Sequence, residues 1–145
     1  MKDFVNVGLL GAGTVGGGVL KVLEKNAEKI AKEVGKPVRI TKVLDRHVDR
    51  LKQEYGDKYI FTDNADEVLE DKDIDIIVEL LGREHPAKEF IARAFANGKH
   101  VVTANKDVLA KFGSELFPLA HEHNCDFMFE ASVCGGIPII GPLKT

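Results

Sequence analysis

The sequence predicts an α/β protein built on a doubly wound parallel sheet of six strands, in the order 3-2-1-4-5-6. Short apolar runs alternate with segments of helical periodicity along nearly the whole chain, which is typical of stacked βαβ units. The first apolar run leads directly into Gly11-Ala12-Gly13-Thr14-Val15-Gly16 and then into a helical pattern. Polar or glycine residues also follow most of the strands, at the edge where such sheets bind ligands.

The composition is that of a globular domain. The chain has 145 residues, of which 44% are hydrophobic and 30% charged, with both signs mixed along it. A formal net charge of −3 gives no basic footprint for nucleic acid or an anionic membrane. No apolar run approaches the roughly 18 residues of a membrane span. Cys125 and Cys134 are too few for a disulfide framework, so we expect reduced thiols and a cytoplasmic location.

The expected strands are apolar runs bounded by turn residues or helix caps. They cover roughly residues 4–10, 38–44, 59–62, 74–80, 100–103 and 126–130. The fourth run carries one charge, Glu79, near its end, as expected for a strand buried on both faces.

The expected helices lie between these strands. The first begins near Thr14 and ends at Gly35, a left-handed cap that Pro37 follows. Further helices are expected over residues 48–55, 65–70 and 86–97. The last opens at Asn105-Lys106 and is expected to break near residues 112–113, with Pro118 limiting where its second half starts.

The glycine turn predicts a site for a dinucleotide. Gly11 allows a tight bend off the strand, and Gly13 lets the backbone approach a pyrophosphate without a Cβ in the way. Gly16 lets the helix lie close to the strand. The diphosphate would then bind to free N–H groups at the positive end of the helix.

Asp45 is the expected partner of the adenine ribose hydroxyls. The usual spacing from the glycine turn is about 20 residues, but Asp45 lies 29 residues beyond Gly16 because the first helix is long. An aspartate favours the free ribose, whereas the neighbouring Arg46 could accept a 2′-phosphate, stack on adenine or remain a surface charge. The choice between NAD and NADP therefore stays open.

Residues after the fourth and fifth strands are the other candidates. Leu81-Gly82 and Thr103 are expected to contact the cofactor, and Lys106 is expected to face the nicotinamide. A lysine there could move a proton or stabilise an oxyanion during hydride transfer. The alternatives are a surface lysine at Lys106 and a plain helix N-cap at Asn105.

Glu130 precedes a turn rich in glycine, Gly135-Gly136-Ile137-Pro138. A carboxylate with several backbone carbonyls is a ligand set for a hard cation, although the same residues would also make a simple structural turn.

Three stretches resemble homoserine dehydrogenase. They are residues 11–16, the run Gly98-Lys99-His100-Val101-Val102-Thr103-Ala104-Asn105-Lys106, and the run from Phe129 to Pro138. The resemblance covers the amino-terminal third of such an enzyme and implies a Rossmann-type fold. It implies NAD(P)-dependent interconversion of L-homoserine and L-aspartate 4-semialdehyde, in threonine and methionine biosynthesis, by a homo-oligomer.

The resemblance also implies roles for particular residues. Lys106 matches the family lysine beside nicotinamide and substrate. Glu130, Val133, Gly135 and Ile137 match a monovalent cation site, usually sodium, in which the last three give main-chain oxygens. The chain departs from the family at Arg83, where a second glycine is common, and at Cys134, where a small residue such as alanine is usual.

The length of the chain leads to an expectation about its domains. Residues 1–131 should form the dinucleotide-binding domain, and residues 132–145 should begin the connection to a substrate and dimerisation domain that is absent. The chain should then bind cofactor without turning over substrate. The alternatives are a nucleotide-sensing regulatory module and an S-adenosylmethionine methyltransferase, which also use a glycine-rich first turn.

Overall fold

The computed structural model describes residues 4–11, 18, 20–21, 24–25 and 27–129. In this part of the chain, six strands form one sheet in the order β3-β2-β1-β4-β5-β6, which confirms the predicted topology. The strands are β1 (Val5–Leu10), β2 (Val38–Leu44), β3 (Ile60–Thr62), β4 (Ile76–Glu79), β5 (His100–Thr103) and β6 (Phe127–Phe129). Every neighbouring pair is parallel.

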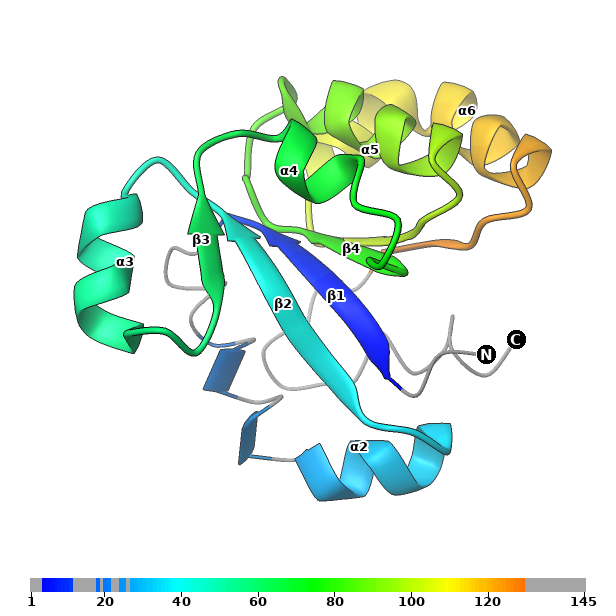
Figure 1. Cartoon of the computed structure of the whole chain (residues 1–145). Helices are drawn as coiled ribbons and strands as arrows, with labels where there is room; N and C mark the ends of the chain where they lie inside the picture. Colours follow the sequence, from blue (N-terminus) through cyan, green and yellow to red (C-terminus); the bar gives the residue numbers. More distant parts are fainter. Residues whose placement is uncertain (1–3, 12–17, 19, 22–23, 26, 130–145) are drawn as a thin grey trace.

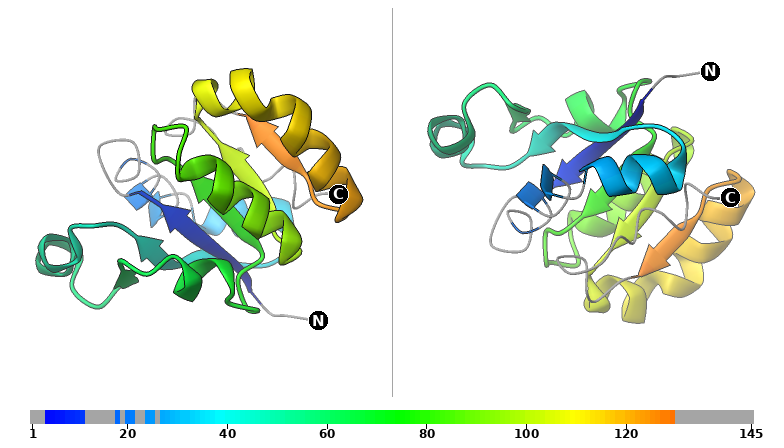
Figure 2. Two further views of the ribbon diagram at one scale, coloured as in Figure 1. Left: turned by 90° about the horizontal axis from the view of Figure 1, so that it is seen from above. Right: turned by 90° about the horizontal axis from the view of Figure 1, so that it is seen from below.

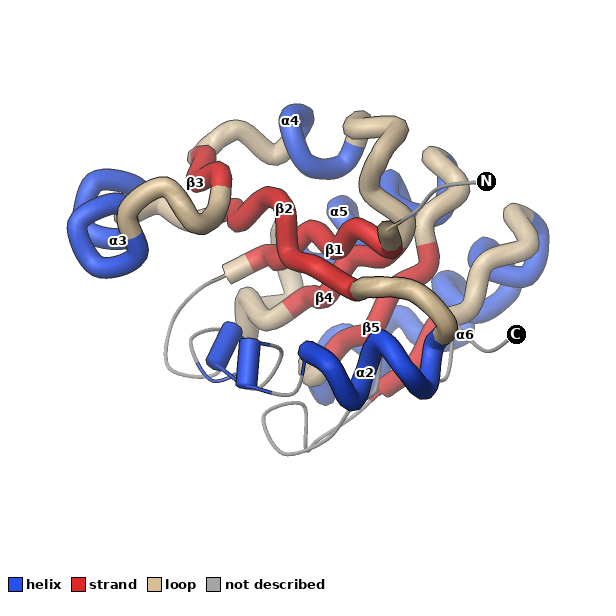
Figure 3. Tube along the Cα trace, turned by 60° about the horizontal axis from the view of Figure 1, so that its bottom comes forward, coloured by secondary structure: helices blue, strands red, loops and turns tan. Residues whose placement is uncertain are grey.

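Helices cover both faces of the sheet. They are α2 (Ala27–Val34), α3 (Val48–Tyr55), α4 (Asp66–Leu69), α5 (Ala87–Ala96) and α6 (Lys106–Glu122). Figures 1 and 2 show α4, α5 and α6 on one face, and Figure 3 shows α2 lying across the other. The described helices are all too short or too polar to cross a lipid bilayer.

The first helix ends where the sequence predicts. Gly35 has φ +93°, and its N–H donates to the carbonyl of Ala31 at 2.8 Å. This is the left-handed cap that glycine forms without steric cost. The predicted start near Thr14 lies outside the described residues.

The central strands are buried on both faces because their side chains alternate between two apolar clusters. Val7 and Leu9 of β1 pack in one cluster, together with Leu51 of α3. Leu10 packs in the other cluster, with Ile91 of α5. Helices on both faces thus exclude water from the sheet, and a ligand can approach it only where the strands end.

The break predicted in the last helix is wrong. α6 runs through Gly113 and Pro118 without interruption. Leu116 is 1% exposed, so packing on the sheet offsets the low helix propensity of these two residues. Pro118 and Ser114 are both exposed, so water can bond the Ser114 carbonyl that the proline leaves without a donor.

Candidate functional site

Backbone hydrogen bonds bring the ends of the central strands together. The N–H of Gly11 donates to the carbonyl of Leu44, at the end of β2, over 2.8 Å. The N–H of Leu80, just beyond β4, donates to the carbonyl of Leu10 over 2.9 Å. The loops that follow β1, β2 and β4 therefore start side by side, at the carboxyl edge of the sheet.

Gly11 makes the bend that the sequence predicts. Its φ is +94°, and a Cβ built on it would lie 3.0 Å from the carbonyl oxygen of Leu80. Any other residue would combine a strained backbone with a close contact that cannot relax easily. The remaining cofactor-binding candidates of this turn, Ala12, Gly13, Thr14, Val15 and Gly16, lie outside the described residues.

A pocket of about 420 Å³ opens between these loops. Its lining combines apolar and charged residues from the ends of four strands and from α5. It is lined by Gly11, Leu44, Asp45, Arg46, His47, Asp63, Ala65, Leu80, Leu81, Arg83, Pro86 and Phe90. Gly11, Asp45, Arg46 and Leu81 are sequence-predicted site residues, so the fold brings them together around one cavity.

Asp45 follows β2 directly and is half-buried. Its Oδ1 accepts a hydrogen bond from the N–H of His47 at 2.8 Å, which bends the chain toward α3. A carboxylate has several lone pairs and can accept more than one hydrogen bond.

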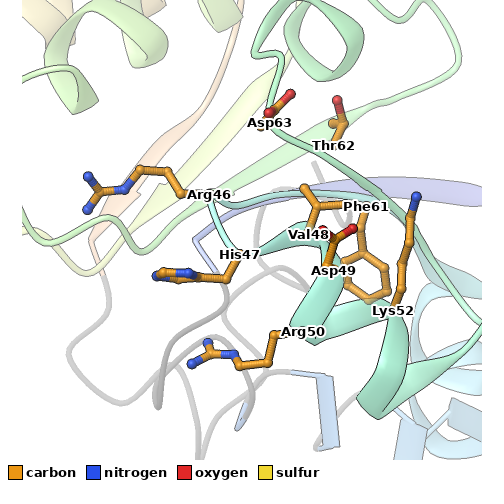
Figure 4. A pocket seen from close by; sticks show the side chains of 9 residues that line it. All are labelled: Arg46, His47, Val48, Asp49, Arg50, Lys52, Phe61, Thr62 and Asp63. Atoms are coloured by element: carbon orange, nitrogen blue, oxygen red, sulfur yellow. The ribbon is translucent and has the colours of Figure 1, made fainter.

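A second hollow, of about 560 Å³, adjoins this pocket at the start of α3. Its lining residues, labelled in Figure 4, are Arg46, His47, Val48, Asp49, Arg50, Lys52, Phe61, Thr62 and Asp63. Figure 4 shows Arg46, His47 and Arg50 extending toward the same side. Two guanidinium groups on one side form a suitable partner for a phosphate.

Glu79 is a fully buried acid at this edge of the sheet, and the sequence analysis gave it no role in the site. It ends β4 with 0% exposure and accepts hydrogen bonds from the Thr103 hydroxyl at 2.6 Å and the Leu81 N–H at 2.7 Å. Burial raises the pKa of the Glu79 carboxyl above its usual range, and these hydrogen bonds oppose the rise only in part. The available signal was the single charge in an otherwise apolar strand.

The other predicted contacts around β4 and β5 have different environments. Leu81 is half-buried and lines the pocket, whereas Gly82 is exposed with φ +77°. Thr103 is fully buried, and its hydroxyl also accepts a hydrogen bond from the Asn105 N–H at 3.0 Å. The Thr103 hydroxyl is therefore fully engaged within the protein.

Lys106 is the first residue of α6 and is exposed. Asn105 before it is the N-cap, and its Oδ1 accepts from the Val108 N–H at 3.2 Å. The N-cap prediction is confirmed. The amide nitrogen of Asn105 also donates to the carbonyl of Arg83 at 2.7 Å, which ties the start of α6 to the loop after β4.

The predicted cation ligands Glu130, Val133, Gly135 and Ile137 lie outside the described residues. Within the described ranges, no cluster of three or more histidine, cysteine or acidic side chains is suited to a metal ion.

The fold and the pocket define the class of the protein. A parallel sheet has a positive-φ glycine after its first strand, an acid after its second, and a pocket between the two. This combination is typical of a dinucleotide-binding domain of the Rossmann type. A family model described as "Homoserine dehydrogenase, NAD binding domain" matches residues 11–130, and the chain belongs to this family.

Individual relatives agree with the family. The chain is 46% identical over 140 residues to a homoserine dehydrogenase of Neisseria gonorrhoeae and 43% identical over 140 residues to one of Bacillus subtilis. Each match covers 97% of this chain and 32% of the relative, so the chain spans about a third of their length. A crystal structure of a homoserine dehydrogenase from Thiobacillus denitrificans superimposes with a TM-score of 0.84 at 46% identity, covering 94% of this chain and 31% of that one.

Proposed function

We propose that this chain is the cofactor-binding part of an NAD(P)-dependent homoserine dehydrogenase, which interconverts L-homoserine and L-aspartate 4-semialdehyde in threonine and methionine biosynthesis. The pocket at the carboxyl edge carries the proposal, because Gly11 and Asp45 both line it in a chain of this family. The bound nicotinamide would accept or release the hydride. The protein itself holds the cofactor and handles the proton and the substrate oxygen.

The proposed cofactor contacts divide by position. Residues 11–16 hold the diphosphate, and Asp45 bonds the adenine ribose. Leu81, Gly82 and Lys106 line the path to the nicotinamide, whereas Thr103 is fully buried and contributes through its hydrogen bonds to Glu79 and Asn105. Arg46 decides the response to a 2′-phosphate, so Arg46→Ala should weaken NADPH binding while it leaves NADH binding nearly unchanged. Equal effects on the two cofactors would mean that Arg46 is a surface charge.

Lys106 is the proposed catalytic residue of this chain. It is exposed at the start of α6, next to the end of β5, where an ammonium group can reach a ligand at the carboxyl edge. Its charge would stabilise the oxygen that changes between hydroxyl and carbonyl, or its amine would carry the proton.

Glu130, Val133, Gly135 and Ile137 are the proposed ligands of a monovalent cation, usually sodium in this family. A carboxylate and backbone carbonyls suit a hard cation. Replacing sodium by a bulky organic cation at constant ionic strength should lower turnover, and Glu130→Gln should remove that dependence. A rate that is indifferent to the cation would overturn the site.

The division into domains is also a proposal. Residues 1–131 form the cofactor domain and residues 132–145 begin the connection to a substrate and dimerisation domain. Turnover then requires parts of a homo-oligomeric enzyme beyond the third that this chain matches. A cytoplasmic location fits the free, buried thiol of Cys125.

Calorimetric titration with NADH, NADPH and S-adenosylmethionine tests the proposal. A nicotinamide cofactor should bind, and S-adenosylmethionine should not. Binding of S-adenosylmethionine alone would indicate a methyltransferase. Cofactor binding without homoserine oxidation by the full-length protein would indicate a nucleotide-sensing module.

A further inference from the structure

Glu79 is a buried carboxylate in a strand that is otherwise apolar. Its Oε1 accepts a hydrogen bond from the Thr103 hydroxyl and its Oε2 accepts one from the Leu81 N–H, and the Asn105 side chain and the Gly82 N–H also donate toward this carboxyl group. In the described part of the chain, no cationic side chain forms an ion pair with it. Burying a carboxylate in this way costs stability, and a well-packed apolar side chain would avoid the cost. The fold gains no evident stability from Glu79.

The hydrogen bonds of Glu79 lead to the start of α6. An ionised carboxylate can only accept, so the Thr103 hydroxyl donates its proton to Glu79, and the same hydroxyl oxygen accepts from the Asn105 N–H. Asn105 in turn caps α6 through the Val108 N–H and donates to the carbonyl of Arg83. The chain of bonds therefore joins three parts of the carboxyl edge, which are the end of β4, residues 81–83 and the first turn of α6.

We propose that Glu79 is a positioning residue for hydride transfer, acting through Thr103 and Asn105 to hold the first turn of α6, and with it Lys106, against the loop after β4. The proposal rests on the proposed function, because it takes Lys106 as the catalytic lysine. Neither Glu79 nor Thr103 needs to touch the substrate. Their effect is geometric, and a small displacement of a catalytic group is expensive in rate.

A carboxylate suits this position better than an amide does. The Leu81 N–H and the Thr103 hydroxyl both donate, so both side-chain oxygens must accept. Glutamine has the same shape but only one acceptor oxygen. Its NH₂ group would either face the Leu81 N–H or donate to the Thr103 oxygen, and in the second case the Thr103 proton would lose its acceptor. Glu79→Gln should therefore displace residues 81–83 or Thr103 without opening a cavity.

The test compares kcat and the KM for cofactor in the full-length protein, normalised to the fraction of molecules that bind cofactor. Glu79→Gln and Thr103→Val should each lower kcat by roughly 10- to 100-fold, while the KM for cofactor changes by less than about threefold. Thr103→Ser keeps the hydroxyl and should recover most of the kcat that Thr103→Val loses. Wild-type kcat in Glu79→Gln or Thr103→Val would overturn the proposal, and so would a Thr103→Ser protein as slow as Thr103→Val.

Two controls separate the possible causes of a loss. Asn6→Ala removes two partly buried hydrogen bonds at the opposite, amino edge of the sheet. There Asn6 donates to the Asp73 carbonyl at 2.9 Å and accepts from Arg39 at 2.8 Å. The substitution should lower stability and leave kcat per folded molecule unchanged. Lys106→Ala tests the catalytic role of Lys106 separately from the positioning role of Glu79. If kcat falls in Lys106→Ala but is normal in Glu79→Gln, only the positioning role is refuted. Wild-type kinetics in Lys106→Ala would refute the assignment of Lys106 itself. If Glu79→Gln fails to fold, the comparison of Val and Ser at position 103 decides the question.

Discussion

At the residue scale, Gly8 of β1 and Gly11 in the turn after it are each required by a different close neighbour. A Cβ on Gly8 would lie 2.6 Å from a methyl group of Val68, so the absence of a side chain at Gly8 lets β1 and the short helix α4 pack closely here. Gly11 instead combines φ +94° with a close approach to Leu80. The motif predicted the bend at Gly11. It gave no signal for Gly8, because that requirement comes from a helix much later in the chain.

Gly11→Ala should damage both the fold and the site. Alanine at positive φ costs about 1–2 kcal/mol, and its methyl group would also push against the Leu80 carbonyl, which borders the pocket. Gly98→Ala is the matched control, because Gly98 has φ +73° but nothing within 4 Å of its added Cβ. Denaturant unfolding should give a loss of stability in both variants, and the larger loss in Gly11→Ala because of its contact with the Leu80 carbonyl. Cofactor titration should give weaker binding in Gly11→Ala alone, and equal binding in both would contradict a role for this bend in the site.

Lys106→Ala should lower kcat more than it lowers cofactor affinity. The missing ammonium no longer stabilises charge at the reacting oxygen, and losses of roughly 100-fold or more are typical of such groups. Lys111→Ala on the same helix is the control, since Lys111 is exposed and pairs with Glu84 at 3.1 Å. Steady-state kinetics of the full-length protein measure both variants. An unchanged rate in Lys106→Ala would remove this lysine from the site.

Sequence reasoning at this scale recognised residues whose identity is tied to a motif or a cap. A plain N-cap was one of the alternatives for Asn105, from its place before a helical pattern, and its side chain makes that bond. Glu79 was noticed as a lone charge but received no role, because its partners are 2 and 24 positions away and meet it only in the folded sheet. Long-range partners of a buried polar group cannot be read from local spacing.

At the element scale, α6 is the clearest difference between sequence and structure. Local propensity predicted a break, since glycine and proline both weaken an isolated helix. The helix nevertheless runs from Lys106 to Glu122, because its apolar face packs on the sheet and on α5. Tertiary packing outweighs propensity here, and no local sequence pattern reveals it.

Gly113→Ala should therefore stabilise the protein. Gly113 is buried in a regular helical turn, and the nearest atoms to an added Cβ are ring carbons of Phe117 at 3.7 Å, an ordinary contact. Alanine in a helix interior is favoured over glycine by about 1 kcal/mol, so the free energy of unfolding should rise by about 0.5–1 kcal/mol. Gly35→Ala is the opposite control, because Gly35 has φ +93° and should lose stability. A loss of stability in Gly113→Ala would mean that the helix is not regular at that point.

At the scale of the whole molecule, the sheet order could be predicted because few topologies satisfy the handedness of parallel crossovers. Parallel strands then necessarily bring their carboxyl ends to one edge, so the general position of the site followed from the order alone. The shape of the pocket did not follow. Asp63 lines it from the loop after β3, Arg83 from the loop after β4 and Phe90 from α5. How closely these residues approach one another depends on side-chain packing.

Two acidic groups make the stability of the fold respond to pH in opposite senses. Burial raises the pKa of Glu79. For Asp71, burial also acts to raise the pKa, but hydrogen bonds from the Asp73 N–H and from Lys42 outweigh it and hold the pKa below its usual range. Asp71 therefore contributes stability above its unfolded pKa, and this contribution is lost as the pH falls through its folded pKa.

A comparison with Glu79→Gln isolates the response of Glu79, because both proteins carry Asp71. A raised pKa means that the folded state holds its proton more tightly than the unfolded chain does. The contribution of Glu79 to stability is thus fully present below its unfolded pKa and is lost as the pH rises through its folded pKa. Urea unfolding between about pH 4 and pH 8 should give a free energy of unfolding of the wild type, relative to Glu79→Gln, that falls as the pH rises above the unfolded pKa of Glu79 and becomes constant above its folded pKa. A difference that is constant over this range would show that the carboxyl titrates alike in the folded and unfolded states, and that Glu79 carries no burial penalty.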